Sequence, residues 1–227
     1  MSDGEASIDA ASQPSGGGRR WIRGALFEVV ETLVLTVVIF FGIQAFVAQP
    51  FQVNQTSMEQ TLEPDQYVLV DKLTPHWAAY TRGDIVVFDP PESAAEANGV
   101  PFIKRIVGLP GDTVSLRDGK VYVNGVALDE PYIVQDDGVA QRTDAQPGQP
   151  SEWLVPDGDL LVFGDHRGAS ADSRVFGPIP ISSVIGRAWL RYWPFDTFGT
   201  LPTPSHPELS GSPLPVLSPS AEASPSQ

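Results

Sequence analysis

The sequence contains no cysteine, which excludes thiol catalysis, disulfide bonds and cysteine metal sites. It has only three histidines and neither an HExxH segment nor an EF-hand loop, so we expect no metal and no other cofactor. Basic residues are also scarce, since 14 lysines and arginines stand against 28 acidic residues. Nucleic acid is therefore not expected as a partner.

One long apolar run lies near the N-terminus, at residues 24–48. As a helix it would measure about 36 Å at ~1.5 Å per residue, enough for a hydrocarbon core of ~30 Å, and we predict one transmembrane helix in the plasma membrane. Residues 19–23 contain three arginines and the next basic residue is Lys72, which predicts a cytoplasmic N-terminus and an extracytoplasmic remainder. The alternative is a cleaved secretory peptide, but bulky Phe46 lies where a small residue should precede a cut after Ala48.

Residues 49–199 are predicted to form one folded, mainly β domain, because short apolar runs recur there between turn signals. Asp118-Gly119 and Asn124-Gly125 are typical of hairpin turns, which favours an antiparallel sheet. No helical periodicity of useful length follows residue 50. The polar stretch 134–151 is interpreted as a surface loop.

Both ends of the chain have the composition of disordered segments. Residues 1–20 contain almost no large apolar residue before Trp21, and residues 200–227 are rich in proline and serine. We predict that neither end belongs to the folded domain.

Ser57, in the polar stretch NQTSMEQTL, is a candidate nucleophile, although a turn serine usually hydrogen-bonds its own backbone. A nucleophilic serine needs a base, and histidine is the usual one. Only His166 is plausibly placed, with Asp165 beside it, and a Ser57/His166/Asp165 triad stays open on the sequence alone. Against it, adjacent residues rarely point the same way.

The other candidate base is Lys104, which lies inside the apolar run FIKRIVGL. It is either an edge-strand lysine that opposes aggregation or a buried base. Desolvation in an apolar pocket lowers a lysine pKa by about 3 to 5 units, and a neutral amine near Ser57 could take its hydroxyl proton. The second interpretation predicts a serine–lysine hydrolase.

Four blocks in the same order resemble bacterial type I signal peptidases, the membrane-anchored serine–lysine proteases that remove signal peptides from exported proteins. The blocks are PFQVNQTSMEQTLEPDQYVLVDKL, RGDIVVFDPP, FIKRIVGLPGDTV and GDHRGASADSRVFGPIP, and together they span most of residues 50–190. The resemblance implies an antiparallel β catalytic domain outside the membrane, acting as a monomer on signal-peptide-bearing preproteins. It also implies cleavage after Ala-x-Ala sites.

The resemblance also implies residue roles. Ser57 would attack the scissile carbonyl, Lys104 would be the general base, and Ser170 would hydrogen-bond the lysine amine. Asp172 and Arg174 would form a supporting ion pair. The substrate pockets would be lined by apolar residues, namely Val53, Met58, Phe102 and Ile103.

The chain departs from the family pattern at the oxyanion position. Many members have a serine two residues before the nucleophile, where this chain has Gln55, so the expected oxyanion hole is the Ser57 backbone N–H with the Gln55 amide.

Two alternative hypotheses for the function stay open. One is a self-cleaving serine–lysine repressor, which this chain resembles less because it has no DNA-binding domain, and the other is an anchored β domain that binds an outside partner. The last predicts an exposed Lys104 far from Ser57.

Overall fold

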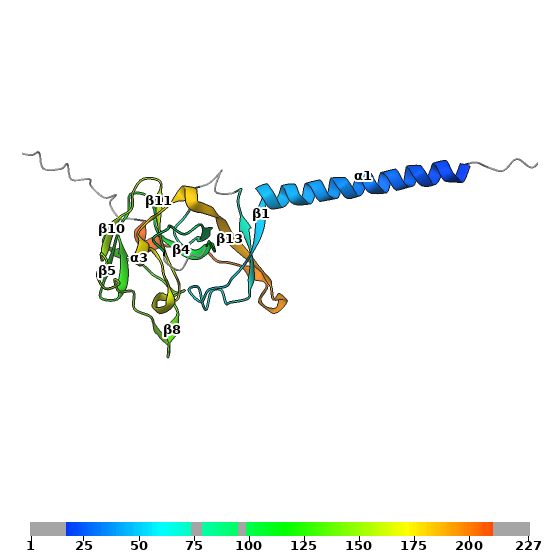
Figure 1. The fold of residues 1–227 in the computed structure, drawn as a ribbon. Helices are drawn as coiled ribbons and strands as arrows, with labels where there is room; N and C mark the ends of the chain where they lie inside the picture. The colour runs from blue at the N-terminus through cyan, green and yellow to red at the C-terminus, as the bar shows by residue number, and fades with distance from the viewer. Residues whose placement is uncertain (1–16, 74–78, 95–98, 211–227) are drawn as a thin grey trace, which may run out of the picture. The chain divides into compact units, whose positions relative to one another are not determined.

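The computed structural model describes residues 17–73, 79–94 and 99–210, and side chains within the N-terminal helix only for residues 26–42 (Figure 1). The chain divides into two compact units, Met1–Ala45 and Phe46–Gln227. The first consists of helix α1 (Gly17–Phe46), and the second contains all the strands. We consider each unit by itself.

Helix α1 exposes large apolar side chains on all sides between Leu26 and Phe41. The predicted span, residues 24–48, reaches past the described side chains at its N-terminal end and across masked ones near its C-terminal end. Within the described residues, the structure has no helix that is both long and apolar enough to cross a membrane.

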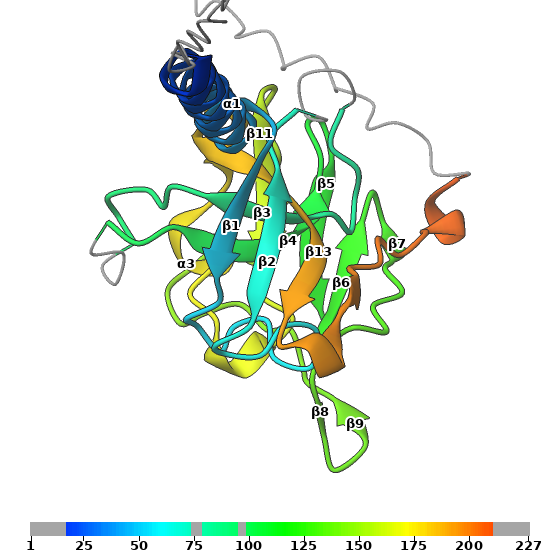
Figure 2. The same cartoon turned by 90° about the vertical axis from the view of Figure 1, so that its right-hand side faces the viewer.

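The larger sheet of the second unit is antiparallel throughout, as the hairpin signals predicted. Figure 2 shows its strands crossing the domain beside one another. In spatial order they are β1 (Ala48–Gln52), β2 (Tyr67–Asp71), β13 (Val184–Trp193), β3 (Ile85–Phe88), β4 (Phe102–Gly108), β11 (Asp159–Phe163) and β12 (Ile179–Pro180), while β14 (Gly199–Thr200) pairs with β13.

A second sheet has the order β10 (Glu152–Leu154), β5 (Thr113–Arg117), β6 (Lys120–Val123) and β7 (Val126–Ala127). Its two turns are the predicted ones, Asp118-Gly119 and Asn124-Gly125, and all four residues have positive φ as tight hairpin turns require. The expected loop 134–151 contains a third hairpin, β8 (Gln135–Asp136) with β9 (Val139–Ala140), which turns at Asp137-Gly138. Its strands are too short for an alternating pattern to show.

The helical segments of the described part of the second unit are all single turns, as the missing periodicity predicted. They are η1 (Arg167–Ala169), α3 (Ser173–Phe176), η2 (Ile181–Ser183), η3 (Phe195–Thr197) and η4 (Pro207–Leu209).

The packed chain continues beyond the expected boundary at Thr200. Thr203 donates to Asp84 at 2.9 Å, and Leu209 packs against the apolar cluster of the smaller sheet. Residues 211–227 of the expected tail lie outside the described residues.

Strand β4 lies between two apolar clusters of the larger sheet and is buried at all seven positions. Ile103 packs with Val53, Met58 and other side chains on one face, while Phe102 packs on the other. A strand covered on both faces places every side chain away from water. Lys104 is therefore held in a dry environment by the apolar residues around it.

Candidate active site

Ser57 lies in a loop that begins after β1 and returns to β2. The loop is closed by backbone hydrogen bonds from Val53 to Gln66 and from Asp65 to Val53, each 2.8 Å. Met58 and Leu62 have no exposed surface and fix the loop to the core. The Ser57 side chain is thereby held in one place and is itself only 3% exposed.

Lys104 reaches Ser57 from the buried strand β4. Its Nζ lies 2.8 Å from Ser57 Oγ, 3.1 Å from the Ile103 carbonyl and 3.4 Å from Gln55 Oε1. Lys104 is 1% exposed, so the edge-strand interpretation of this residue is wrong. A serine hydroxyl and a lysine amine at hydrogen-bond distance are the arrangement that a serine–lysine hydrolase needs.

Burial lowers the pKa of Lys104 from 10.5 to about 8, while the negative charges of Asp172 and Asp165 act in the opposite direction. At pH 7 about one molecule in ten then carries a neutral amine, against about one in 2,500 for an unperturbed lysine. The environment thus supplies a base that is available near neutral pH.

The Asp172–Arg174 ion pair expected from the resemblance is present and almost completely buried. Arg174 donates to both carboxylate oxygens of Asp172, at 2.9 and 2.8 Å. Asp172 also caps α3 and accepts from the Gly164 backbone N–H at 3.0 Å. One carboxylate therefore fixes both ends of the segment that carries Ser170.

The hydrogen bond expected between Ser170 and Lys104 is not formed. Ser170 Oγ is buried and has no partner in the described part of the chain, while the three N–H donors of a charged Lys104 are already used. Ser170 is nevertheless close, because a Cβ added at Gly164 would lie 2.3 Å from Ser170 Oγ and 2.6 Å from the Ser57 carbonyl. Only glycine fits between the two serines.

The structure does not form the Ser57/His166/Asp165 triad. Asp165 accepts two hydrogen bonds from Arg105, at 2.9 and 2.7 Å, and is fully buried. His166 turns its Nδ1 to within 2.7 Å of Glu59 Oε2, and it touches Ser57 only through a backbone bond to the Ser57 carbonyl. Of the other histidines, His206 faces Glu208 and His76 lies outside the described residues.

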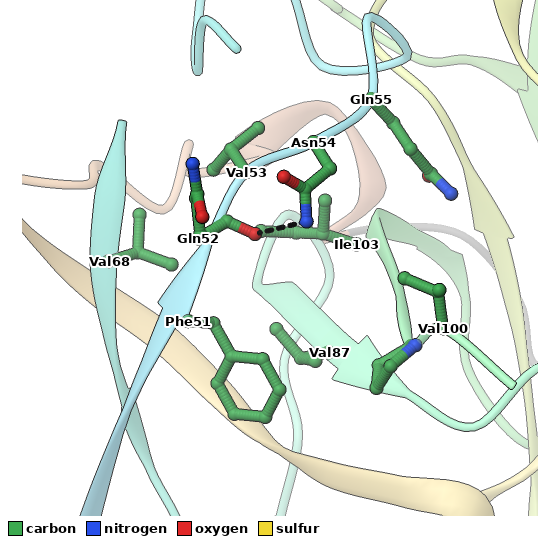
Figure 3. Close-up of a pocket in the computed structure, with 10 residues that line it drawn as sticks. Phe51, Gln52, Val53, Asn54, Gln55, Val68, Val87, Val100 and Ile103 are labelled. Atoms are coloured by element: carbon green, nitrogen blue, oxygen red, sulfur yellow. Dashed lines mark hydrogen bonds between the residues drawn. The ribbon is translucent and has the colours of Figure 1, made fainter. Parts of the chain in front are cut away.

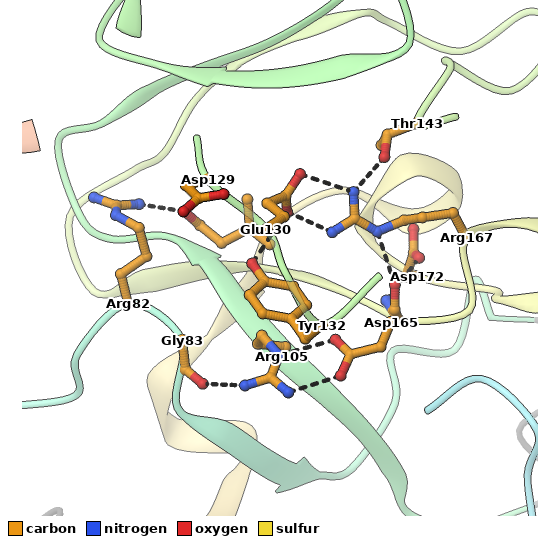
Figure 4. Close-up of polar contacts among 12 residues, drawn as sticks. Arg82, Gly83, Arg105, Asp129, Glu130, Tyr132, Thr143, Asp165, Arg167 and Asp172 are labelled. Carbon is orange, nitrogen blue, oxygen red and sulfur yellow. Dashed lines mark hydrogen bonds and ion pairs between the residues drawn. The ribbon is translucent and has the colours of Figure 1, made fainter. Parts of the chain in front are cut away.

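Figure 4 shows a network of buried charges around Arg105 and Arg167. Arg105 donates to Asp165 and to the Gly83 carbonyl at 2.7 Å, and its guanidinium stacks 4.1 Å from the Tyr132 ring. Arg167 pairs with Glu130, and each of these two side chains is no more than 5% exposed. These contacts join four distant segments of the sequence around β4.

A cavity of about 260 Å³ opens at Ser57. Its walls come from the loop of Ser57, from β4 and from the end of η1 with the residues after it, through Asn54, Gln55, Thr56, Ser57, Phe102, Lys104, Ala169 and Ala171. Over the described residues, no group of histidine and acidic side chains is arranged to hold a metal ion. The reactive atoms present in this cavity are those of Ser57 and Lys104.

A second, small cavity of about 20 Å³ adjoins the first and shares Asn54 and Gln55 with it. Figure 3 shows apolar side chains around it, including Val53 and Ile103, two of the expected pocket residues. A volume of this size holds little more than one water-sized group. Met58 lines neither cavity and lies in the core instead.

Comparison with known proteins agrees with this geometry. The family described as signal peptidase, peptidase S26, matches residues 26–193, which is well over half of the chain. The chain belongs to the signal peptidase family. The expected family, enzyme class and antiparallel β fold are therefore confirmed.

Individual relatives cover most of this signal peptidase. A signal peptidase I of Leptolyngbya laminosa is 39% identical over 201 residues, which is 87% of this chain and 92% of the relative. A signal peptidase I of Bacillus licheniformis is 35% identical over 77% of this chain and 92% of its own length. A crystal structure of a signal peptidase I from Enterococcus faecalis is 35% identical, with a TM-score of 0.38 over 48% of this chain and 97% of the other.

The oxyanion position of this signal peptidase is only partly arranged for its expected role. The Ser57 backbone N–H has no acceptor among the described residues and is free to donate to a bound carbonyl. The Gln55 side chain presents its oxygen to Lys104, at 3.4 Å, so its amide nitrogen would have to turn toward the substrate.

Sequence reasoning missed the buried Arg105–Asp165 ion pair of this signal peptidase. Both faces of β4 are buried, and the sequence pattern does not say what an arginine meets there. Its partner Asp165 lies 60 positions away in the sequence. The sequence did contain a signal for this pair, because Arg105 and Asp165 each lie beside or inside an apolar block and charged residues are rarely buried without a partner.

Proposed function

We propose that this signal peptidase cleaves preproteins after small residues at positions −1 and −3, with Ser57 as nucleophile and Lys104 as general base. The observation that carries this assignment is the 2.8 Å contact between Lys104 Nζ and Ser57 Oγ inside an apolar site. Burial that lowers the pKa of the amine to about 8 makes it a base near neutral pH.

The reaction follows from these positions. Neutral Lys104 accepts the hydroxyl proton as Ser57 Oγ attacks the scissile carbonyl, and the tetrahedral oxyanion accepts a hydrogen bond from the Ser57 backbone N–H. The protonated lysine then gives its proton to the departing amine, which leaves an acyl ester on Ser57. A water molecule, deprotonated by Lys104, hydrolyses this ester and restores the enzyme.

Strand addition is the mode of substrate binding that the backbone supports. Strand β4 pairs with β3 over Phe102 to Arg105, whereas its pairing with β11 begins only at Arg105. Residues 102–104 therefore have one edge that the described strands do not cover. An extended peptide between this edge and residues 53–55 would place alternate side chains in the two cavities.

The size of the small cavity supports selection for alanine at −3. The small cavity beside Val53 and Ile103 would receive the side chain at −3, and the cavity at Ser57 would receive the one at −1. Since a cavity of about 20 Å³ accepts one methyl-sized group, larger side chains at −3 would clash. This matches the first alanine of the Ala-x-Ala pattern expected from the family.

We also propose a single membrane anchor with a cytoplasmic N-terminus and an extracytoplasmic catalytic domain. Support comes from the family, whose members are membrane-anchored, from the exposed apolar side chains of α1, and from the three arginines at 19–23. Protease accessibility of the domain in sealed, oriented vesicles tests this arrangement, because only an outside domain is digested without detergent.

The test of the activity is cleavage of an Ala-x-Ala precursor by the purified full chain in detergent. Wild type should cut after the second alanine, whereas Ser57→Ala and Lys104→Ala should be inactive although both remain folded by circular dichroism. Lys120→Ala, which changes an exposed lysine of a hairpin, is the matched control and should cut normally. An inactive wild type, or a variant of Ser57 or Lys104 that keeps near-full activity, would favour an anchored binding module instead.

A further inference from the structure

A third cavity, of about 500 Å³, continues from the cavity at Ser57. The two share Phe102, Ala169 and Ala171, so they form one hollow with a common wall. None of the residues around the third cavity lines the small cavity beside Val53 and Ile103. The three cavities therefore form a row, with Ser57 in the middle one.

The order of the three cavities in this row indicates which part of the substrate each end receives. The small cavity shares Asn54 and Gln55 with the middle one, whereas the third cavity shares residues from the opposite wall. If the small cavity takes the side chain at −3, a peptide that passes Ser57 in an extended form reaches the third cavity after the scissile bond. This step rests on the proposed function, which sets the direction of the substrate.

The lining of the third cavity fits an apolar side chain. Its apolar lining comes from Phe102 and Phe176, whose ring centroids lie 6.4 Å apart, from three alanines, and from Val175, which is 40% exposed. The cavity is about 25 times larger than the one assigned to −3, by the ratio of 500 to 20 Å³. A cavity of this size does not restrict the bound side chain to alanine.

The same cavity also has polar walls. Ser170 lines it together with Ser93 and Gln146, while the Ser170 Oγ itself is enclosed by the protein and makes no hydrogen bond to any described residue. A cavity with apolar walls and a few polar side chains is the pattern of a ligand subsite.

We propose that this cavity binds the first residues of the mature protein, at positions +1 to +3, and gives the enzyme a preference for an apolar side chain there. The apolar side chain rests on Phe102, Phe176 and Val175. Specificity then comes from both sides of the cut, with small residues required before it and a larger apolar one favoured after it.

The experiment uses peptides with a constant Ala-x-Ala segment in which +1, +2 and +3 are varied one at a time among leucine, lysine and aspartate. Cleavage is measured with wild type, Val175→Asp and Val175→Lys, both acting on an exposed rim residue that is expected to tolerate them. At one of the three positions, the Val175→Asp variant should cleave the lysine peptide better than the aspartate peptide, and the Val175→Lys variant should do the reverse. The ratio of kcat/KM for these two peptides should change about tenfold relative to wild type. Leucine should be favoured by wild type.

Leu154→Asp is the matched control, because Leu154 is an exposed apolar residue of the smaller sheet, is 56% exposed and lines none of the three cavities. The Leu154→Asp variant should show the same preferences among the peptides as wild type. Equal preferences in both Val175 variants at all three positions would overturn the subsite while leaving cleavage intact. A wild type that cuts no peptide would instead contradict the proposed function.

Discussion

The Arg105 guanidinium donates to both carboxylate oxygens of Asp165, and this buried ion pair lies one residue away from Lys104. Thr61, four residues after Ser57, donates to the same carboxylate at 2.6 Å. One carboxylate thus connects the strand of the proposed base to the loop of the proposed nucleophile. The relative position of the two reacting groups depends on this contact as well as on the apolar core.

Breaking this ion pair on one side is expected to cost more than an ordinary surface change. Arg105→Met leaves Asp165 buried without its cation and should lower the free energy of unfolding by about 3 to 5 kcal/mol. Urea unfolding measures the change, and Arg142→Met is the control, because the Arg142–Asp144 pair is 66% and 56% exposed and should contribute little to stability. A loss no larger than that of the control would show that Asp165 finds another partner.

A milder change in the same contact should affect the reaction more than the fold. Thr61→Val keeps the volume of the side chain but removes the hydrogen bond to Asp165, so the loop of Ser57 is less firmly held. We expect kcat to fall about tenfold with little change in KM, since small misplacements of a nucleophile are costly. Thr61→Ser should restore most of the activity, and kcat of the valine variant equal to wild type would contradict a positioning role.

The pH dependence of cleavage should report the protonation of Lys104. Because the neutral amine is the base and its pKa is about 8, kcat/KM should rise with pH and level off above about pH 8. Below that value it should fall about tenfold per pH unit. The profile of a peptide without titratable side chains measures this directly, and a limb that levels off near pH 6 would indicate a different base.

The same burial has a cost in stability. The folded pKa of about 8 lies below the ordinary value of 10.5, so the unfolded chain binds more protons between these values and stability falls as pH drops from 10.5 to 8. Below pH 8 the full cost, about 3 kcal/mol, is present. Lys104→Met should therefore be inactive but more stable by about that amount at pH 7.

Urea unfolding at pH 7 and pH 10 tests this prediction. The gain of Lys104→Met should shrink at the higher pH, while Lys120→Met, on an exposed residue, should change little at either pH. A methionine variant that is less stable than wild type at pH 7 would mean that the lost hydrogen bonds to Ser57 and Ile103 outweigh the relief from burial.

Local patterns predicted the features that depend on neighbouring residues. The turns at Asp118-Gly119 and Asn124-Gly125 were evident because glycine follows a residue that tolerates positive φ. Lys104 was evident because charged residues inside an apolar run are unusual. Both inferences need only a few consecutive residues.

Features that depend on distant contacts were not predictable in this way. The chain from Leu201 to Ser210 has the composition of a disordered tail, yet Leu201, Thr203 and Leu209 all meet partners on the folded domain. Met58 was assigned to a pocket from the family resemblance, whereas the turn of the loop directs its side chain into the core. In each case a contact far away in the sequence decides the outcome.

Gln55 is the residue where the chain departs most from the expected site, and its role can be tested. If its amide donates to the oxyanion, Gln55→Ala should lower kcat by about 10² with KM nearly unchanged, because the interaction exists only in the transition state. Gln55→Ser supplies a shorter donor and should retain more activity than the alanine variant. Gln55→Glu places a second acceptor beside Lys104 and should raise the pH at which activity levels off, as a negative charge near an amine raises its pKa. An alanine variant with unchanged kcat would leave the Ser57 backbone N–H as the sole donor from this loop and assign Gln55 to holding Lys104 through its amide oxygen.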